Sequence, residues 1–513
     1  MNQLVSKKNF ILAGFIIIKF LLQYQLIDSA YDLHRDEYLH LDQARHLAWG
    51  YASVPPVTSW ISYVIALLGN SVFWIKFFPA LFGALTIVVV WKTIEVLKGN
   101  VFALVLGAVA VMLSSILRIN ILYQPNSLDI LAWSSFYFVL IKYVQSEKSK
   151  WLYAAAVVFA VGFLNKYNFV FLLVGLFPAL LLSPQRKLFA KKELYYAVIA
   201  GLLLILPNLL WQYHNKFPVW HHLDELARRQ LVNIQRADFI KEQFLFFLGA
   251  LFIIIAAFVS LIIDKSFKPY RFFLWAFIFT LTVYIYLKAK GYYAIGLYPV
   301  FIAFGAVYLS RLFQNGWKRW LQPVALAVPV LLFIPFYRIG FPNKSPQAIQ
   351  QHAASYIKMG LLRWEDGKDH ELPQDFADML GWKELAQITD SAWATLPTNE
   401  YTMVLCDNYG QAGAVNYYSK NKNIQALSFN ADYLNWFKLD RKIINMIVIK
   451  EPGDTIEAGA TQLFESTYTF GHIKNSFARE YGAGVYILKH ARSDVNAIIE
   501  QEIKKRKSST TGF

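Results

Sequence analysis

Long apolar stretches recur along the chain as far as about residue 337 and then stop. Some approach the roughly 20 residues that an α-helix needs to cross a bilayer, whereas others are shorter. We therefore expect a polytopic α-helical membrane protein with about 11 transmembrane helices, some of them broken or buried in the bundle. The expected spans are 10–27, 72–97, 102–117, 128–143, 152–164, 169–182, 194–211, 244–263, 272–287, 293–312 and 320–336.

From about residue 338 the pattern becomes that of a water-soluble fold. Short runs rich in β-branched and aromatic residues alternate with helical patterns, which predicts a C-terminal soluble α/β domain. We thus divide the chain into a transmembrane domain, 1–337, and an α/β domain, 338–513. The expected strands are 401–406, 424–428, 445–449 and 485–488, and the expected helices are 347–359, 382–394 and 412–419.

The basic residues of the loops predict the orientation. Lys7 and Lys8 precede the first span, and the short loop 186–192 holds four basic residues, so both are placed in the cytoplasm. An odd number of spans then puts the C-terminal domain outside. The same counting puts five polar segments outside: 28–71, 118–127, 165–168, 212–238 and 288–292. The first apolar run is interpreted as an uncleaved span, with a cleaved signal peptide as the alternative.

The composition narrows the class of protein. Hydrophobic residues make up 56% of the 513 residues and charged residues only 16%, so lipid must be part of the solvent. The net charge of +16 would suggest nucleic acid in a soluble protein, but the bases lie mostly between apolar runs, where membrane lipids explain them better. We therefore expect no nucleic-acid partner. The only cysteine, Cys406, excludes an intramolecular disulfide and a multi-cysteine metal cluster.

A cluster of ionisable residues follows the first span directly. Asp36 and Glu37 are adjacent acids beside Arg35, close to the membrane, which suits a general base or a site for an anionic lipid. The stretch 37–48 is expected to be a helix lying at the interface. The alternative is an ordinary solvated loop in which Asp36 or Glu37 caps that helix.

Positive charges at the outer membrane edges run against the positive-inside pattern. Lys166, Lys288 and Lys290 join Arg35 there, and binding a lipid phosphate would explain them. The alternative is that they reach toward headgroups. Asp129 begins a span, where an isolated acid is costly, so it is either a site residue or a helix cap. Three loop histidines are more often polar surface than metal ligands: His214, His221 and His222.

Several motifs, in this order, resemble the dolichyl-phosphate-mannose–protein mannosyltransferase-like family. That family includes the bacterial aminoarabinose transferases and has the GT-C fold. The motifs are Arg35-Asp36-Glu37, Ala44 to Tyr51 with Pro55-Pro56, Pro125 to Asp129, Leu164 to Tyr167, Pro207 to Gln212, and Lys290 to Tyr293.

The resemblance implies a glycosyltransferase of the bacterial inner membrane. It would move a sugar from a polyprenyl-phosphate-linked donor to a hydroxyl-bearing acceptor (protein, lipid A or glycan) at the outer face. Asp36 would be the base, with Glu37 beside it. The implied substrate contacts are Arg35, Asp129, Lys166, Lys288, Lys290, Tyr292 and Tyr293. Ser53-Val54 stand where some members have an acid before the prolines, so dependence on a divalent cation stays open.

A transporter or flippase of anionic or glycosylated lipids is the rival hypothesis. It predicts ionisable residues in the middle of the spans, whereas here they gather at outer ends, apart from Lys92 and Glu95 near an inner end. Within the C-terminal domain, Asn408 to Gly413 superficially resembles a phosphate-binding turn. It lacks the complete glycine pattern, so we interpret it as strand–turn–helix packing.

Overall fold

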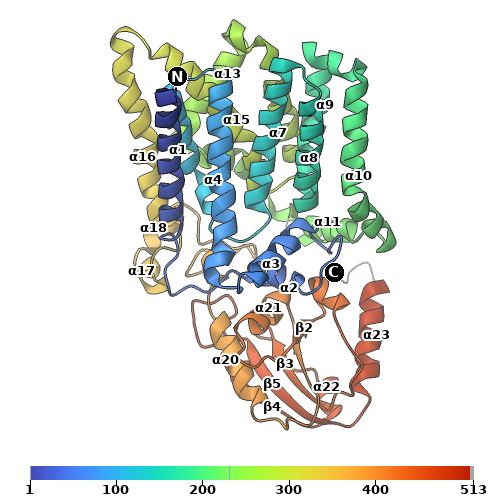
Figure 1. Ribbon diagram of the computed structural model, residues 1–513. Helices are drawn as coiled ribbons and strands as arrows, with labels where there is room; N and C mark the ends of the chain where they lie inside the picture. Colours follow the sequence, from blue (N-terminus) through green and yellow to red (C-terminus); the bar gives the residue numbers. More distant parts are fainter. Residues whose placement is uncertain (1, 230, 509–513) are drawn as a thin grey trace.

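The computed structural model describes residues 2–229 and 231–508. A bundle of long helices forms one end of the molecule, and a small sheet with its own helices forms the opposite end (Figure 1). The N-terminus lies at the end of the bundle away from the sheet. The main bundle helices are α1 (Asn2–Gln23), α4 (Val72–Val96), α5 (Val101–Met112), α7 (Asn126–Ser146), α8 (Lys150–Asn165), α9 (Val170–Leu181), α10 (Lys192–His214), α12 (Arg236–Leu245), α13 (Leu251–Ile263), α14 (Phe272–Tyr286), α15 (Tyr298–Leu312) and α16 (Leu321–Ile339).

The expected polytopic helical architecture is confirmed, but the expected number of spans is not. Among the described residues, five helices are long and apolar enough to cross a membrane, or up to seven if each of two bent pairs is one span. Other expected spans, such as those of α5, α8 and α14, form apolar helices of only 10–17 residues. Polar breaks shorten these elements, and short helices of this kind depend on neighbouring helices to satisfy the backbone at their ends.

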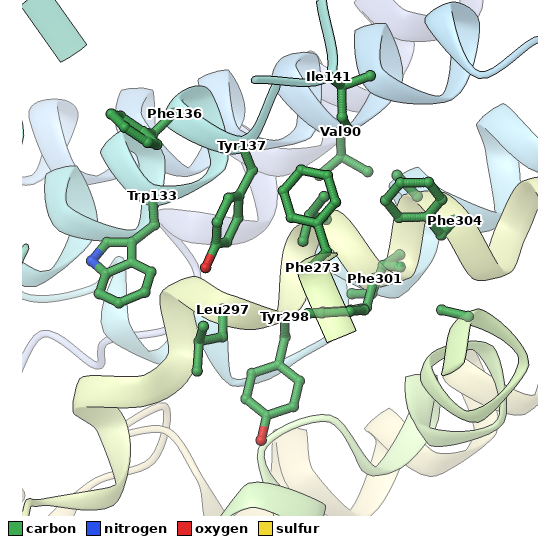
Figure 2. Packing of buried hydrophobic residues seen from close by; sticks show 14 of the residues in the cluster. Val90, Trp133, Phe136, Tyr137, Ile141, Phe273, Leu297, Tyr298, Phe301 and Phe304 are labelled. Atoms are coloured by element: carbon green, nitrogen blue, oxygen red, sulfur yellow. The ribbon is translucent and has the colours of Figure 1, made fainter. Parts of the chain in front are cut away.

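The bundle is arranged around α15. In Gly291–Leu312, which contains α15, 89% of the most apolar 18-residue stretch is buried inside the protein. The corresponding stretch of α10 is only 22% buried, and that of Gly316–Ile339, which contains α16, only 17%. Figure 2 shows Tyr298, Phe301 and Phe304 of α15 packed among aromatic side chains of α7 and α14. A Cβ on Gly305 would lie 1.9 Å from the carbonyl oxygen of Ile253, so this glycine permits the close approach of α13. We expect α10 and α16 to face lipid.

Short helices occupy the level between bundle and sheet (Figure 1): α2 (Arg35–Gln43), α3 (Val57–Leu67) and α11 (Pro218–Arg229). The predicted helix 37–48 is correct in kind, but α2 begins two residues earlier and ends at Gln43. It ends there because the chain turns toward Tyr51, whose hydroxyl donates to the carbonyl oxygens of Gln43 and His46. The sequence analysis did not predict α3.

A five-stranded mixed sheet forms the centre of the C-terminal α/β segment, which we define as residues 338–508. Its strands are β1 (Thr402–Cys406), β2 (Ala426–Ser428), β3 (Asn445–Lys450), β4 (Phe464–His472) and β5 (Gly484–Ala491). The order is β2-β1-β3-β5-β4, with β1 parallel to β2 and β3, and β5 antiparallel to β3 and β4. Four strands match the predicted runs, whereas β4 is mostly exposed and polar and was not predicted. Flanking helices include α20 (Trp382–Trp393), α21 (Tyr409–Tyr418) and α23 (Val495–Ser508).

The segment 28–71 and the C-terminal segment share one hydrophobic core. Tyr38 of α2 is fully buried and packs edge-on against Trp382 of α20. A Cβ on Gly413 of α21 would lie 2.5 Å from Cβ of Tyr38, so only glycine permits this contact between α2 and α21. The segment 28–71 is therefore held against the C-terminal segment, and the domain boundary at 337/338 stays a prediction.

Candidate active site

The start of α2 positions both acids of the predicted pair. His34 is the N-cap, and its Nδ1 accepts a hydrogen bond from the Asp36 amide at 3.3 Å. Glu37 reaches back and accepts from the His34 amide at 2.7 Å, which completes a capping box. These bonds fix the first turn of α2, and consecutive residues of that turn point in different directions. Asp36 and Glu37 therefore have separate surroundings.

Glu37 is fully buried, and its carboxylate is saturated with donors. Nζ of Lys76 on α4 lies 2.6 Å and 2.7 Å from its two oxygens. The amide of Tyr123 donates to it at 2.6 Å. With the His34 amide, the carboxylate accepts four hydrogen bonds, three of which join Glu37 to α4 and to the segment before α7. The arrangement suits a structural ion pair, because no part of the carboxylate faces solvent.

Asp36 is the accessible member of the pair, with 37% of its side chain exposed. Its Oδ1 accepts from the Tyr409 hydroxyl at 2.6 Å and its Oδ2 from Nε2 of Gln124 at 3.0 Å. Burial alone would raise the pKa of Asp36. Its basic neighbours, His34 and Arg35, and the Tyr409 hydrogen bond outweigh the effect of burial and hold the pKa of Asp36 below its ordinary value. Asp36 is thus an ionised carboxylate within reach of a substrate.

A chain of hydrogen bonds runs from Asp36 to Lys166. Oε1 of Gln124 accepts from Asn126 at 2.9 Å, and Oδ1 of Asn126 accepts from Nζ of Lys166 at 2.6 Å. The Lys166 ammonium lies 4.5 Å and 5.1 Å from the ring centres of Tyr293 and Tyr292. Burial, assisted by the charge of Lys290, lowers the pKa of Lys166 to about 8.

Asp129 lies behind this cluster on the first turn of α7 and is 5% exposed. Its oxygens accept from Nε1 of Trp133 and Nδ2 of Asn168, both at 3.0 Å. Asn168 also donates to the carbonyl oxygen of Tyr293 at 3.2 Å. Asp129 thereby connects α7 to the turn η6 (Gly291–Leu297), which carries the two tyrosines, and its charge lies in electrostatic range of Lys166.

The remaining predicted cations occupy different places. Lys290 joins the Lys166 cluster and pairs with Glu365 of the C-terminal segment at 3.1 Å. Lys288 has a left-handed backbone, with φ of +52°, and among the described residues its side chain makes no ion pair. Arg35 lies on the other side of Asp36, with its guanidinium 4.7 Å from the ring centre of Tyr409. The structure thus brings together Asp36, Asp129, Lys166, Lys290 and the two tyrosines, and leaves Lys288 apart.

Three residues near the site were not predicted. Lys76 lies near the start of an apolar span, where a lysine needs an acidic partner, and that placement was a usable signal. Gln124 directly precedes the Pro125–Asp129 motif, which was a second signal. Tyr409 is the second residue of the Asn408–Gly413 motif that we interpreted as packing. In the described part of the chain, no group of three or more His, Cys, Asp or Glu side chains is arranged to hold a metal ion.

Comparisons with known proteins agree with the motif resemblance. Residues 53–211 match the family described as dolichyl-phosphate-mannose-protein mannosyltransferase. The lipid A galacturonosyltransferase RgtD of Rhizobium johnstonii is 25% identical over 224 residues, which are 42% of this chain. The match covers 46% of RgtD, so the chain spans about half the length of this curated relative.

The fold has solved counterparts. ArnT from Cupriavidus metallidurans bound to undecaprenyl phosphate matches with a TM-score of 0.61 at 14% identity, over 93% of this chain and 97% of ArnT. Its apo state matches with a TM-score of 0.62 over 94% and 98%. At this identity the likeness concerns the fold. The chain therefore has the fold of ArnT, and its residues 53–211 are similar to the dolichyl-phosphate-mannose-protein mannosyltransferase family.

Proposed function

We propose that this protein transfers a sugar from a polyprenyl-phosphate-linked donor to an acceptor hydroxyl, on the membrane side where the sheet lies, with Asp36 as the base. One observation carries the proposal. An exposed, ionised carboxylate is joined by an unbroken chain of side chains to a cluster of cations and tyrosines. Sugar transfer from a lipid phosphate requires two such groups, one that accepts the proton of the acceptor hydroxyl and one that binds the departing phosphate anion.

The reaction follows from this arrangement. Asp36 takes the proton of the acceptor hydroxyl while the hydroxyl oxygen bonds to the anomeric carbon of the sugar. The bond from that carbon to the phosphate oxygen breaks, and the polyprenyl phosphate leaves with the electron pair. The positive charges of Lys166 and Lys290 repel one another. A phosphate between them removes this repulsion, so the cluster favours the anion as it forms.

The names of the relatives suggest the substrates. ArnT is described as bound to undecaprenyl phosphate, and RgtD as a lipid A galacturonosyltransferase. We therefore take an undecaprenyl-phosphate-linked sugar as the donor and lipid A as the first acceptor to test. A groove of about 350 Å³ between Trp49 and the C-terminal end of α10 has room for part of a lipid tail. Beside it, Asn208 of α10 donates to the carbonyl oxygen of Trp49 and to the hydroxyl of Tyr167, the residue that follows Lys166.

The transporter hypothesis would need ionisable side chains along the middle of the spans. Three buried ionisable residues of the bundle are Lys19, Lys76 and Asp129. Each lies within five residues of the end of its helix nearest the sheet. Such placement serves chemistry at one membrane surface better than passage through the bilayer.

The test is sugar transfer by the purified protein. Undecaprenyl phosphate carrying radiolabelled galacturonic acid serves as the donor and lipid A as the acceptor. We expect the wild type to label lipid A, and Asp36→Asn to lower the rate by about 10²- to 10⁴-fold, as for loss of a general base. Asp28→Asn is the matched control, because the carboxylate of this acid accepts from the amide of Ala30 and takes no part in the chain of hydrogen bonds from Asp36 to Lys166. Undiminished transfer by Asp36→Asn would contradict the role of Asp36.

If neither substrate is accepted, mass spectrometry of lipids and glycoproteins from cells with and without the protein identifies the true pair. A molecule class that loses the mass of one sugar in the deletion strain reveals the acceptor. An unchanged glycome together with altered lipid sidedness would favour the transporter instead.

A further inference from the structure

The C-terminal segment supplies one of the two hydrogen bonds that Asp36 accepts. Helix α21 begins at Tyr409, directly after Asn408, whose side chain accepts from the Gln411 amide at 3.0 Å and caps the helix. The first residue of α21 is thereby placed over the start of α2. The Tyr409 hydroxyl donates to Oδ1 of Asp36 at 2.6 Å, a short bond to a charged acceptor.

The docking of the two helices does not depend on this bond. Asp42, near the end of α2, accepts from Asn416 of α21 at 2.6 Å and from the Tyr433 hydroxyl at 2.7 Å. Gln43 donates to Asp432 at 2.8 Å. Since all these contacts lie away from Asp36, the Tyr409 hydroxyl is an additional element that acts on Asp36 alone.

We propose that Tyr409 is a positioning residue for the transfer reaction, one whose hydroxyl holds Oδ1 of Asp36 and leaves Oδ2 to receive the acceptor proton. The inference rests on the proposed function and extends it to the second part of the chain. The proton passes from the acceptor hydroxyl to Oδ2, which accepts one hydrogen bond from Gln124 within the described chain and lies 3.8 Å from Nδ1 of His34. The Tyr409 proton stays in place. The C-terminal segment is then a component of the active centre as well as a neighbour of it.

The charges around Asp36 support this role. Asp36 faces His34, Arg35 and His40 from its own segment, Tyr409 from α21, Asp378 from the C-terminal segment, and Tyr292 from η6. Burial and the neighbouring Asp36 carboxylate raise the pKa of Tyr409, so its hydroxyl remains protonated and donates. Because this hydrogen bond favours the carboxylate form, its removal raises the pKa of Asp36.

Tyr409→Phe tests the proposal, because it keeps the ring beneath Arg35 and removes only the hydroxyl. We expect kcat for transfer from undecaprenyl phosphate galacturonic acid to lipid A to fall about tenfold, while KM for the donor stays within about twofold. The acid limb of the pH profile of kcat/KM should move to higher pH by about one unit.

Tyr433→Phe is the matched control. It removes an equivalent tyrosine–carboxylate bond between the C-terminal segment and α2, but at Asp42. We expect its acid limb to match that of the wild type. An unshifted limb in Tyr409→Phe, or equal shifts in both variants, would overturn the inference while leaving the proposed function intact. Absence of transfer by the wild type, or full activity of Asp36→Asn, would overturn the proposed function and the inference with it.

Discussion

At the residue scale, two neighbouring carboxylates on one helical turn have opposite surroundings. Glu37 is enclosed by Lys76 and two backbone amides, whereas Asp36 is exposed over 37% of its side chain and bonded by neutral donors. An enclosed carboxylate paired with a lysine has no free lone pair to accept a substrate proton. We therefore propose the role of base for Asp36 alone, and Glu37 stabilises the helical turn that carries it.

We expect Glu37→Gln to lower the free energy of unfolding by about 3–5 kcal/mol, because it leaves the buried ammonium of Lys76 without a counter-charge. Thermal unfolding of the purified protein measures the change. Glu95→Gln is the control, since the Lys92–Glu95 pair is more exposed and its loss should cost less than about 1 kcal/mol. A Glu37→Gln variant with wild-type stability but no transfer would assign Glu37 to the chemistry after all.

The second residue-scale prediction concerns the alkaline side of the pH profile. Burial and the charge of Lys290 lower the pKa of Lys166 to about 8. Below this pH the ammonium is charged and attracts the donor phosphate; as the pH rises through about 8 it loses its proton, and kcat/KM should fall. Lys166→Arg should move this limb well above pH 8, because a guanidinium stays charged. Lys166→Met should lower kcat/KM about 10- to 100-fold below pH 8. A limb that stays near pH 8 in Lys166→Arg would show that another group titrates.

At the scale of elements, the contact between α2 and α21 determines how the site is built. The two helices approach closely where Gly413 faces Tyr38, and the hydrogen bond from Asn416 of α21 to Asp42 of α2 holds the contact at its far end. A rigid contact of this kind places Tyr409 against Asp36 with little freedom. Loosening α21 should therefore affect both stability and transfer.

Gly413→Ala tests this coupling. The added Cβ would lie 2.5 Å from Cβ of Tyr38 and 2.8 Å from the Tyr433 hydroxyl, so α21 must shift away from α2. We expect a loss of about 1–3 kcal/mol in unfolding free energy, together with slower transfer. Gly459→Ala in α22 (Ala458–Gln462) is the control, because its Cβ would meet nothing within 4 Å. An unchanged rate in a destabilised Gly413→Ala would separate the helix contact from catalysis.

At the scale of the whole molecule, local sequence patterns predicted most of the helices and strands but few of the tertiary contacts between them. Apolar periodicity located the helices of the bundle, and β-branched runs located four of five strands. Strand β4 was not predicted, because its residues are mostly exposed and polar and form no apolar run. Asp36, Lys166 and the tyrosines were chosen from motifs at one membrane face, and the structure places them together. Tyr409 could not be found in this way, because 373 residues separate it from Asp36 and only the fold joins them.

The orientation in the membrane is the last prediction, and it concerns the molecule as a whole. Cys406 is buried, so the unmodified chain should react little with a membrane-impermeant maleimide. Lys474→Cys places a thiol at an exposed position beside the sheet, and Lys187→Cys places one in the exposed turn η2 (Pro184–Ala190) between α9 and α10. If basic loops stay in the cytoplasm, intact spheroplasts should label Lys474→Cys and spare Lys187→Cys until the membrane is opened. The reverse pattern would put Asp36 and the lysines on the cytoplasmic side, and an acceptor exposed only at the outer face could not reach them.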